Sequence, residues 1–463
     1  MPSKNRLRCT CFFIFLSSIL FIASSYAEEN AATMYQQASS LFSDISSFPH
    51  DEINKVIKDG WKEGNEGLKA ILAQNKEAIE GFKKATEITY CDFTFGKPPV
   101  KDLIAMGPSH LKELRIAKLM MLEAKLYEEE HKPDLALENY LALTRYVRHL
   151  EQQKAFILLT KATVWVTETP LYSAIDRYLE QNENVNIEDF QSILSMLLSL
   201  KSDKLRITLE NAFEEERTAH RNTIIRLLDS PDFLSEYFGQ NEREQEASGK
   251  AVTPDKGKES AKDKPIKLIK KVRQAIYKEY NKSDNEWYPY LVAAFRENNY
   301  NAFNKRYEQS GVLKFTPFSW FVFTQPYLLK NKLFQWMFSS TIAKTISRLF
   351  VQMPMPGYNR QIVYYYNSVS RLNLLIAAVA VRCYEIEKGK MLENLQELVP
   401  AYLEKIPEDP FDNFKPLKYV KKENGWIVYS FGPDKQDDFA GVEIDEEAHG
   451  LSKAKGDIVF QSF

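Results

Sequence analysis

The chain has 463 residues, of which 44% are hydrophobic and 13% aromatic, so it can hold two or three domains, or one long helical array, around a substantial core. Its 61 basic and 63 acidic residues give a formal net charge of −2. This balance leaves no overall positive surplus to neutralise phosphates, and it argues against a nucleic-acid partner.

The first 27 residues have the pattern of a secretory signal peptide. Basic residues precede an apolar run over residues 12–26, and the small residues Ser25 and Ala27 stand at the −3 and −1 positions of a cleavage site before Glu28. We therefore expect export across the inner membrane and a periplasmic or secreted mature chain. The alternative is a retained signal that anchors the chain in the membrane. No later stretch reaches the roughly 20 apolar residues that a membrane span needs.

Beyond the signal, the sequence divides into four regions. Residues 28–239 have helical periodicity almost throughout, and residues 240–265 are polar and charged, which predicts a flexible linker or loop. Residues 266–356 form an aromatic-rich helical region, and residues 357–463 a long helix followed by a small α+β module. The expected fold is mainly α, with helical hairpins and a C-terminal module that contains an antiparallel β-hairpin.

An antiparallel helical hairpin is predicted within the first region. Apolar residues recur at helical spacing before and after the polar turn from His131 to Asp134. The segment from Ala124 to Tyr140 resembles the helix-turn-helix of a tetratricopeptide repeat, with a small residue, an aromatic residue, a short turn, and then Ala-Leu-Glu and Tyr. The period of about 34 residues is not repeated, so a single hairpin is the firmer prediction.

The aromatic side chains of the third region, including Trp336 and Phe338, are expected in the core, because a secreted chain that exposed so many would aggregate. A long helix is predicted from about Arg360 to Glu387.

Strand-like alternation marks the end of the chain. Leu417–Val420 and Trp426–Ser430 predict a hairpin with its turn at residues 421–425, and residues 458–460 a last strand. A short helix is expected from Leu395 to Tyr402.

The residues of this last region occur in a familiar order. Three runs follow one another: Leu395 through Leu-Val-Pro to Pro-Glu-Asp-Pro, then Pro416-Leu-Lys-Tyr, then Trp426-Ile-Val-Tyr-Ser-Phe-Gly-Pro-Asp. Together they resemble the C-terminal domain of the major pseudopilin of type II secretion systems. The match extends over residues 372–438. Further segments are Asn30-Ala-Ala-Thr-Met-Tyr, Cys91-Asp-Phe, the hairpin from Ala124 to Leu150 and Gly456-Asp-Ile-Val-Phe. With these, the whole chain resembles a group of exported proteins of planctomycete-type bacteria that end in this module. This resemblance implies location and architecture only.

One departure from the pseudopilins is important. They begin with a prepilin-peptidase site and an apolar assembly helix, whereas this chain begins with an ordinary signal. We therefore expect the module to act as a soluble or peripheral domain.

The resemblance also implies a calcium site. In the secretion pseudopilins the loop after the hairpin binds calcium, and the matching positions are Ser430, Asp434, Asp437 and Asp438. Clustered oxygen ligands on a flexible loop suit a hard cation. The alternative is a solvated acidic turn capped by Asp434. No other cofactor is indicated.

Two cysteines remain after the signal, Cys91 and Cys383. In an oxidising compartment they could form a disulfide across a very long loop, or each could be a buried small residue. They lack the two further ligands of a zinc site.

The sequence has no catalytic motif, and its densest ionisable group runs from Glu214 to His220. Glu216 and His220 stand at positions i and i+4, as metal ligands do in some helical bundles, although a charged helix face gives the same pattern. We expect an exported, non-catalytic helical scaffold or interaction protein with a protein partner in the cell envelope. The alternative is an envelope enzyme with its site around Glu216 and His220.

Overall fold

The computed structural model describes only part of the chain. The described residues are 30–43, 49–62, 65–93, 111–151, 186–200, 204–229, 270–296, 331–352, 355–441 and 455–462, residue 305 and some positions between 167 and 178. The signal at residues 1–27 and the linker at residues 240–265 lie outside them. The chain forms two compact units, one of Met1–Lys97 with His110–Gln153 and one of Pro98–Ser109 with Lys154–Phe463. This boundary falls inside residues 28–239, which the sequence predicts to be a single helical region.

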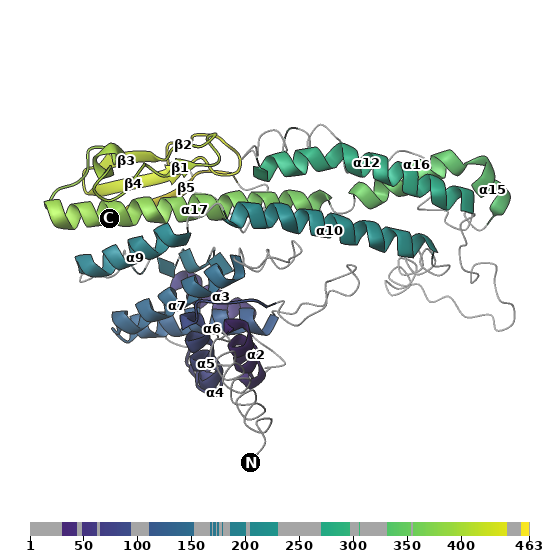
Figure 1. Ribbon diagram of the computed structural model, residues 1–463. Coiled ribbons are helices and arrows are strands. Elements are labelled where there is room, and N and C mark those ends of the chain that lie inside the picture. Colours follow the sequence, from purple (N-terminus) through teal and green to yellow (C-terminus); the bar gives the residue numbers. More distant parts are fainter. Residues whose placement is uncertain are drawn as a thin grey trace, which may run out of the picture. The chain divides into compact units, whose positions relative to one another are not determined.

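The described helices of the first unit pack around a core of aromatic and aliphatic side chains. Asn30 caps the first helix by accepting a hydrogen bond from the amide of Ala32, and its side chain also bonds both backbone groups of Asp92. The helices are α2 (Ala31–Leu41), α3 (His50–Asp59), α4 (Glu66–Gln74), α5 (Lys76–Glu87), α6 (Leu111–Glu129) and α7 (Pro133–Glu151) (Figure 1).

The predicted helical hairpin is confirmed in α6 and α7. Its short turn contains His131 at φ 56°, and the amide of Lys132 donates to the carbonyl of Tyr127. Asn139 of α7 then joins the two helices by donating to the carbonyl of Met120 at 3.1 Å. The connection is too short for any but an antiparallel arrangement. The likeness to a tetratricopeptide repeat stays a prediction.

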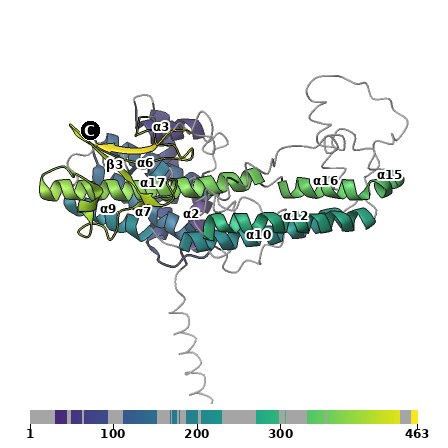
Figure 2. The ribbon, with the colours of Figure 1, turned by 90° about the horizontal axis from the view of Figure 1, so that it is seen from above.

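The second unit contains longer helices. They are α9 (Ile187–Leu200), α10 (Lys204–Asp229), α12 (Lys270–Arg296), α15 (Lys332–Met337), α16 (Ser339–Gln352) and α17 (Met355–Lys388). Helix α12 packs against both α10 and α16 (Figure 1), and Figure 2 shows α16 beside α12 from above. We call α10, α12, α15 and α16 the helical arm. None of the described helices is long and apolar enough to cross a bilayer.

The C-terminal module packs its sheet on the long helix α17. Strands β3 (Lys418–Lys422), β4 (Gly425–Ser430) and β5 (Ile458–Ser462) are antiparallel in the order β3-β4-β5, with Val428 opposite Tyr419 and Phe460. A small second sheet pairs β1 (Glu408–Asp409) with β2 (Lys415–Pro416). Every residue of β4 is buried, so this central strand forms the core of the module. The expected fold, mainly helical with an α+β end, is confirmed.

The boundaries of these elements differ in detail from the prediction. The hairpin turn is only two residues long, because Lys422 pairs directly with Gly425, so the strands extend further than the alternation indicates. The expected helix after Leu395 is a short 3-10 helix, η4 (Leu395–Leu398), which ends shortly before Pro400. Proline lacks the amide that a longer helix would use.

Candidate functional site

A loop after β4 lies against the chain segment that leads into β5. We call residues Phe431 to Gly441 the β4 loop. Gly432 has φ +69°, and a Cβ atom there would lie 2.3 Å from the carbonyl oxygen of Gly456. The amide of Gly456 donates to Oδ2 of Asp434 at 3.0 Å. Because both contact positions are glycines, the two backbones can approach closely enough to fix the loop to the sheet.

Asp457, directly before β5, holds the other end of the loop. Its side chain is fully buried, and Oδ2 accepts a hydrogen bond from the amide of Ala440 at 2.7 Å. Oδ1 is buried and has no hydrogen-bond partner among the residues that the structure describes. Burial, aided by the nearby charges of Asp437 and Asp438, raises the pKa of Asp457 to about 6, although the backbone amides oppose the shift. The sequence did not indicate this residue as part of the site.

Asp409 of β1 anchors the start of the same loop. It is buried, and its carboxylate accepts three hydrogen bonds: from the amide of Phe411 at 2.8 Å, from the hydroxyl of Ser430 at 2.7 Å and from the amide of Phe431 at 2.9 Å. Burial raises its pKa, and these hydrogen bonds oppose the rise. The hydroxyl of Ser430, one of the predicted calcium ligands, is thus bound to Asp409.

Two of the other predicted calcium ligands, Asp434 and Asp437, also have side-chain partners within the protein. The oxygens of Asp434 accept from the amides of Gln436 and Gly456, at 3.1 and 3.0 Å. Oδ1 of Asp437 accepts from the hydroxyl of Tyr429 and the amide of Phe439. Across the part of the chain that the structure describes, no three His, Cys, Asp or Glu side chains are placed to hold a metal ion. The side-chain oxygens of Ser430, Asp434 and Asp437 are thus already hydrogen-bonded, whereas Oδ1 of Asp457 has no partner among the described residues and is the feature that fits a cation. Calcium binding stays a prediction.

Phe439 is the most exposed large apolar side chain of the β4 loop, at 76%. The residue has φ 54°, and its amide donates to Asp437 at 3.0 Å. The next amide, that of Ala440, is bound to Asp457. The loop thus holds an aromatic ring in solvent on a backbone that is fixed on both sides.

His220 of the predicted enzyme site faces the neighbouring helix. Its Nδ1 lies 3.0 Å from the hydroxyl of Tyr280 on α12, and burial lowers its pKa, against the opposing charge of Asp284. Glu214 is exposed and Glu216 is half-buried. The structure does not place Glu216 and His220 in a three-residue metal site within the described chain.

Charged residues around His220 join α10 to α12. Asp284 accepts from Nε of Arg217 at 2.8 Å and from Nη2 of Arg221 at 2.6 Å. The guanidinium of Arg217 also lies 3.8 Å from the ring centroid of Tyr288. Two arginines of α10 thus bind one carboxylate of α12, and these ion pairs hold the two helices together.

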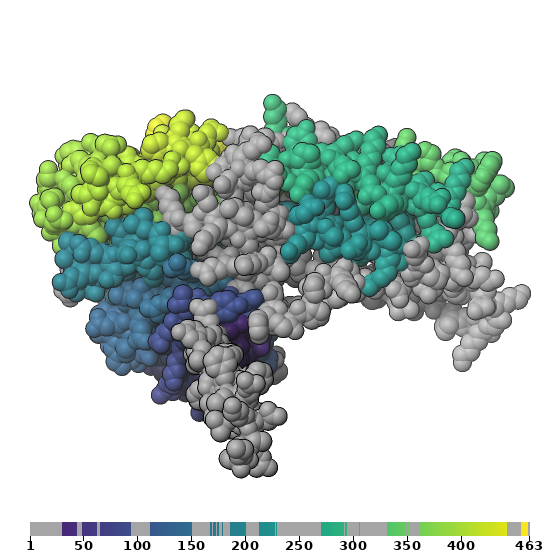
Figure 3. Space-filling view, viewed as in Figure 1, coloured from purple at the N-terminus to yellow at the C-terminus, as the bar shows by residue number. Residues whose placement is uncertain are grey.

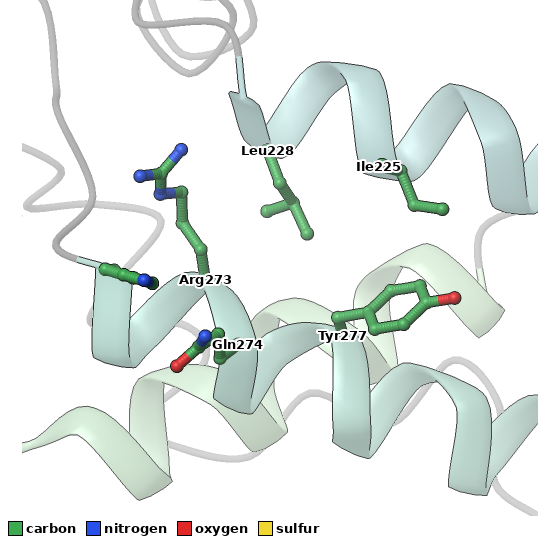
Figure 4. A pocket seen from close by; sticks show the side chains of 6 residues that line it. Ile225, Leu228, Arg273, Gln274 and Tyr277 are labelled. Atoms are coloured by element: carbon green, nitrogen blue, oxygen red, sulfur yellow. The ribbon is translucent and has the colours of Figure 1, made fainter.

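A cavity of about 360 Å³ lies further along the same pair of helices (Figure 4). It is lined by Ile225, Leu228, Lys270, Arg273, Gln274 and Tyr277. Its mixture of apolar and cationic side chains suits an apolar group that bears a negative charge. Neither Glu216 nor His220 lines it, so the predicted catalytic pair and the cavity are separate features.

The two cysteines belong to different units. Cys91 lies in the first unit and is 7% exposed, whereas Cys383 lies in α17 and is fully buried. Burial raises the pKa of Cys383 to about 11, so its reactive thiolate form is scarce at neutral pH. The pairing of these cysteines stays a prediction.

No protein-family model matches the chain, and no similar protein was found among curated proteins or solved structures.

Proposed function

We propose that the chain is an exported, non-catalytic helical scaffold of the cell envelope that binds a protein partner through its pseudopilin-like C-terminal module. The exposed ring of Phe439 on the fixed β4 loop carries this proposal. Aromatic residues are enriched among the side chains that dominate protein–protein binding energy. A side chain on a loop that is already ordered loses little further entropy on binding.

The order of elements in the module supports the pseudopilin resemblance. A long helix, a short helix, a hairpin and an acidic loop follow one another, and the sheet lies on the helix. Figure 3 shows this C-terminal part, in yellow-green, as one continuous surface. A domain of this kind offers a loop for contact while its core stays intact.

The test uses the full chain, tagged at its C-terminus, and recovery of bound proteins from envelope fractions by quantitative mass spectrometry. Phe439→Ala is the test variant. Ile386→Ala, which changes another exposed apolar side chain, 47% exposed on α17, is the matched control. We expect one or more partners to bind wild type and control alike, and Phe439→Ala to recover them about tenfold less well, a loss near 1.4 kcal/mol.

Equal recovery with all three proteins would reject the β4 loop as the contact. Export is tested separately by sequencing the mature N-terminus, which we expect at Glu28 in a periplasmic or secreted fraction. A chain that keeps Met1 in the membrane fraction would instead be anchored.

A further inference from the structure

Helix α15 lies at one end of the helical arm (Figure 1), and large apolar side chains of this helix and of Phe338, directly after it, are exposed. Leu333 is 65% exposed, Trp336 58%, Met337 61% and Phe338 38%. The sequence predicted that Trp336 and Phe338 lie in the core, and the structure shows that this prediction was wrong for both. An exposed apolar group of this size usually marks an interaction surface.

The exposed side chains stand on an ordered support. Asn331 caps α15 by accepting from the amides of Leu333 and Phe334, at 2.9 and 3.1 Å. Gln335, on the opposite side of the helix, is fully buried. One side of α15 is therefore attached to the arm, and the other presents its apolar groups to solvent.

The surroundings of this apolar group are cationic. Nζ of Lys271 lies 5.2 Å from the ring centroid of Trp336, and Lys332 is exposed at the start of α15. Further along the arm, helix α16 also carries the exposed residues Lys344 and Arg348. Neither α15 nor α16 contains an aspartate or a glutamate. The charge of this surface is thus complementary to a negatively charged partner.

We propose that α15 is an interfacial anchor that binds the surface of an anionic lipid bilayer. Leu333, Trp336 and Met337 would enter the boundary between head groups and acyl chains, and the surrounding lysines would contact anionic head groups. The lysines favour lipid over protein, because lysine is depleted in protein interfaces but extends readily from an apolar contact to head groups. With six residues, α15 lies on a bilayer and does not span it.

This inference goes beyond the proposed function and does not depend on Phe439. The two surfaces are built from different elements, the β4 loop and the helical arm. A protein could dock by one and bind lipid by the other.

The experiment is co-sedimentation of the full chain, produced without residues 1–27, with lipid vesicles. One set contains about 30% phosphatidylglycerol in phosphatidylcholine and the other phosphatidylcholine alone, since anionic lipid attracts each nearby Lys or Arg. The test variant is Trp336→Ser with Met337→Ser, and the control is Ile386→Ser, which removes an exposed apolar side chain of α17. Circular dichroism and a melting curve check that each variant folds.

We expect wild type and control to bind the anionic vesicles, about tenfold more strongly than the neutral ones, and to be released by high salt. The double variant should bind about tenfold less. Equal binding by variant and wild type would overturn the proposal, as would no binding of wild type to anionic vesicles. A wild-type dimer that the double variant loses in sedimentation equilibrium, without vesicle binding, would assign the surface to a second copy and also overturn it.

Discussion

The hydroxyl group of Tyr35 lies 2.9 Å from Nδ1 of His149, and this contact joins α2 to α7 in the core of the first unit. Tyr35 is fully buried and His149 is 4% exposed. Burial lowers the pKa of His149 to about 4, although a hydrogen bond with the backbone of Ile88 opposes the shift. The imidazole is therefore neutral at physiological pH.

The first unit should lose stability in acid because of this histidine. Between pH 6.5 and about 4 the unfolded chain binds a proton at His149 that the folded chain does not, so the free energy of unfolding falls as the pH falls. The full effect is about 3 kcal/mol. Urea unfolding at several pH values should show this slope in wild type and lose most of it in His149→Gln.

The matched control is His131→Asn, which removes an exposed histidine at a positive φ that asparagine tolerates. It should keep the wild-type slope. An unchanged slope in His149→Gln would show that other groups cause the acid sensitivity.

Asp409 should be far more important for stability than its neighbour Glu408. Asp409→Ala leaves three donors of Phe411, Ser430 and Phe431 without their acceptor in a buried site. We expect a loss of at least about 3 kcal/mol, since each of the three orphaned buried donors costs about 1–3 kcal/mol. Glu408→Ala removes only an exposed ion pair with Lys405 and should cost below about 1 kcal/mol. Denaturant unfolding measures both, and equal losses would contradict the anchoring of the loop by Asp409.

The close approach of Gly432 to Gly456 gives a test with an internal control. Gly432 and Gly389 both have positive φ, at +69° and +64°, but nothing lies within 4 Å of a Cβ at Gly389. Gly389→Ala should cost only the backbone penalty, about 1 kcal/mol. Gly432→Ala adds a contact with a backbone oxygen and should lower the melting temperature distinctly more. The same shift in both variants would mean that the β4 loop moves aside without cost.

Local patterns in the sequence were sufficient for the regular elements. The hairpin of α6 and α7 followed from apolar periodicity and from the turn before Pro133, and the strand hairpin from alternation around Trp426. Their boundaries were less predictable, because the two-residue turn at Glu423 and Asn424 depends on pairing between strands.

The candidate site depends on contacts between residues that are far apart in the chain, and no local sequence pattern predicts such contacts. Asp409 and Asp457 reach the β4 loop only because β1 and β5 fold back beside it. The spacing of Glu216 and His220 showed a shared helix face but could not show that Tyr280 and Asp284 of α12 would cover it. Trp336 stands among many aromatic residues, which led to the prediction of a core position. In the structure Gln335 faces the arm instead, and Trp336 faces solvent.

Calcium should stabilise the C-terminal module if a cation binds near Asp457. Its buried Oδ1 has no hydrogen-bond partner within the described part of the chain, and the charges of Asp437 and Asp438 are close enough to raise the pKa of Asp457. A divalent cation with oxygen ligands would offset this repulsion. At about 100 times the dissociation constant, binding adds about 2.7 kcal/mol, so the melting temperature of chelator-treated protein should rise by several degrees with calcium.

Asp437→Asn combined with Asp457→Asn should abolish the calcium response, because both changes remove negative charge from the site. Magnesium is the control ion, since it requires a stricter octahedral geometry and gives up its water reluctantly. If calcium leaves the melting temperature of wild type unchanged, the β4 loop is an acidic turn held by its own backbone amides, and the raised pKa of Asp457 reflects burial and its charged neighbours alone.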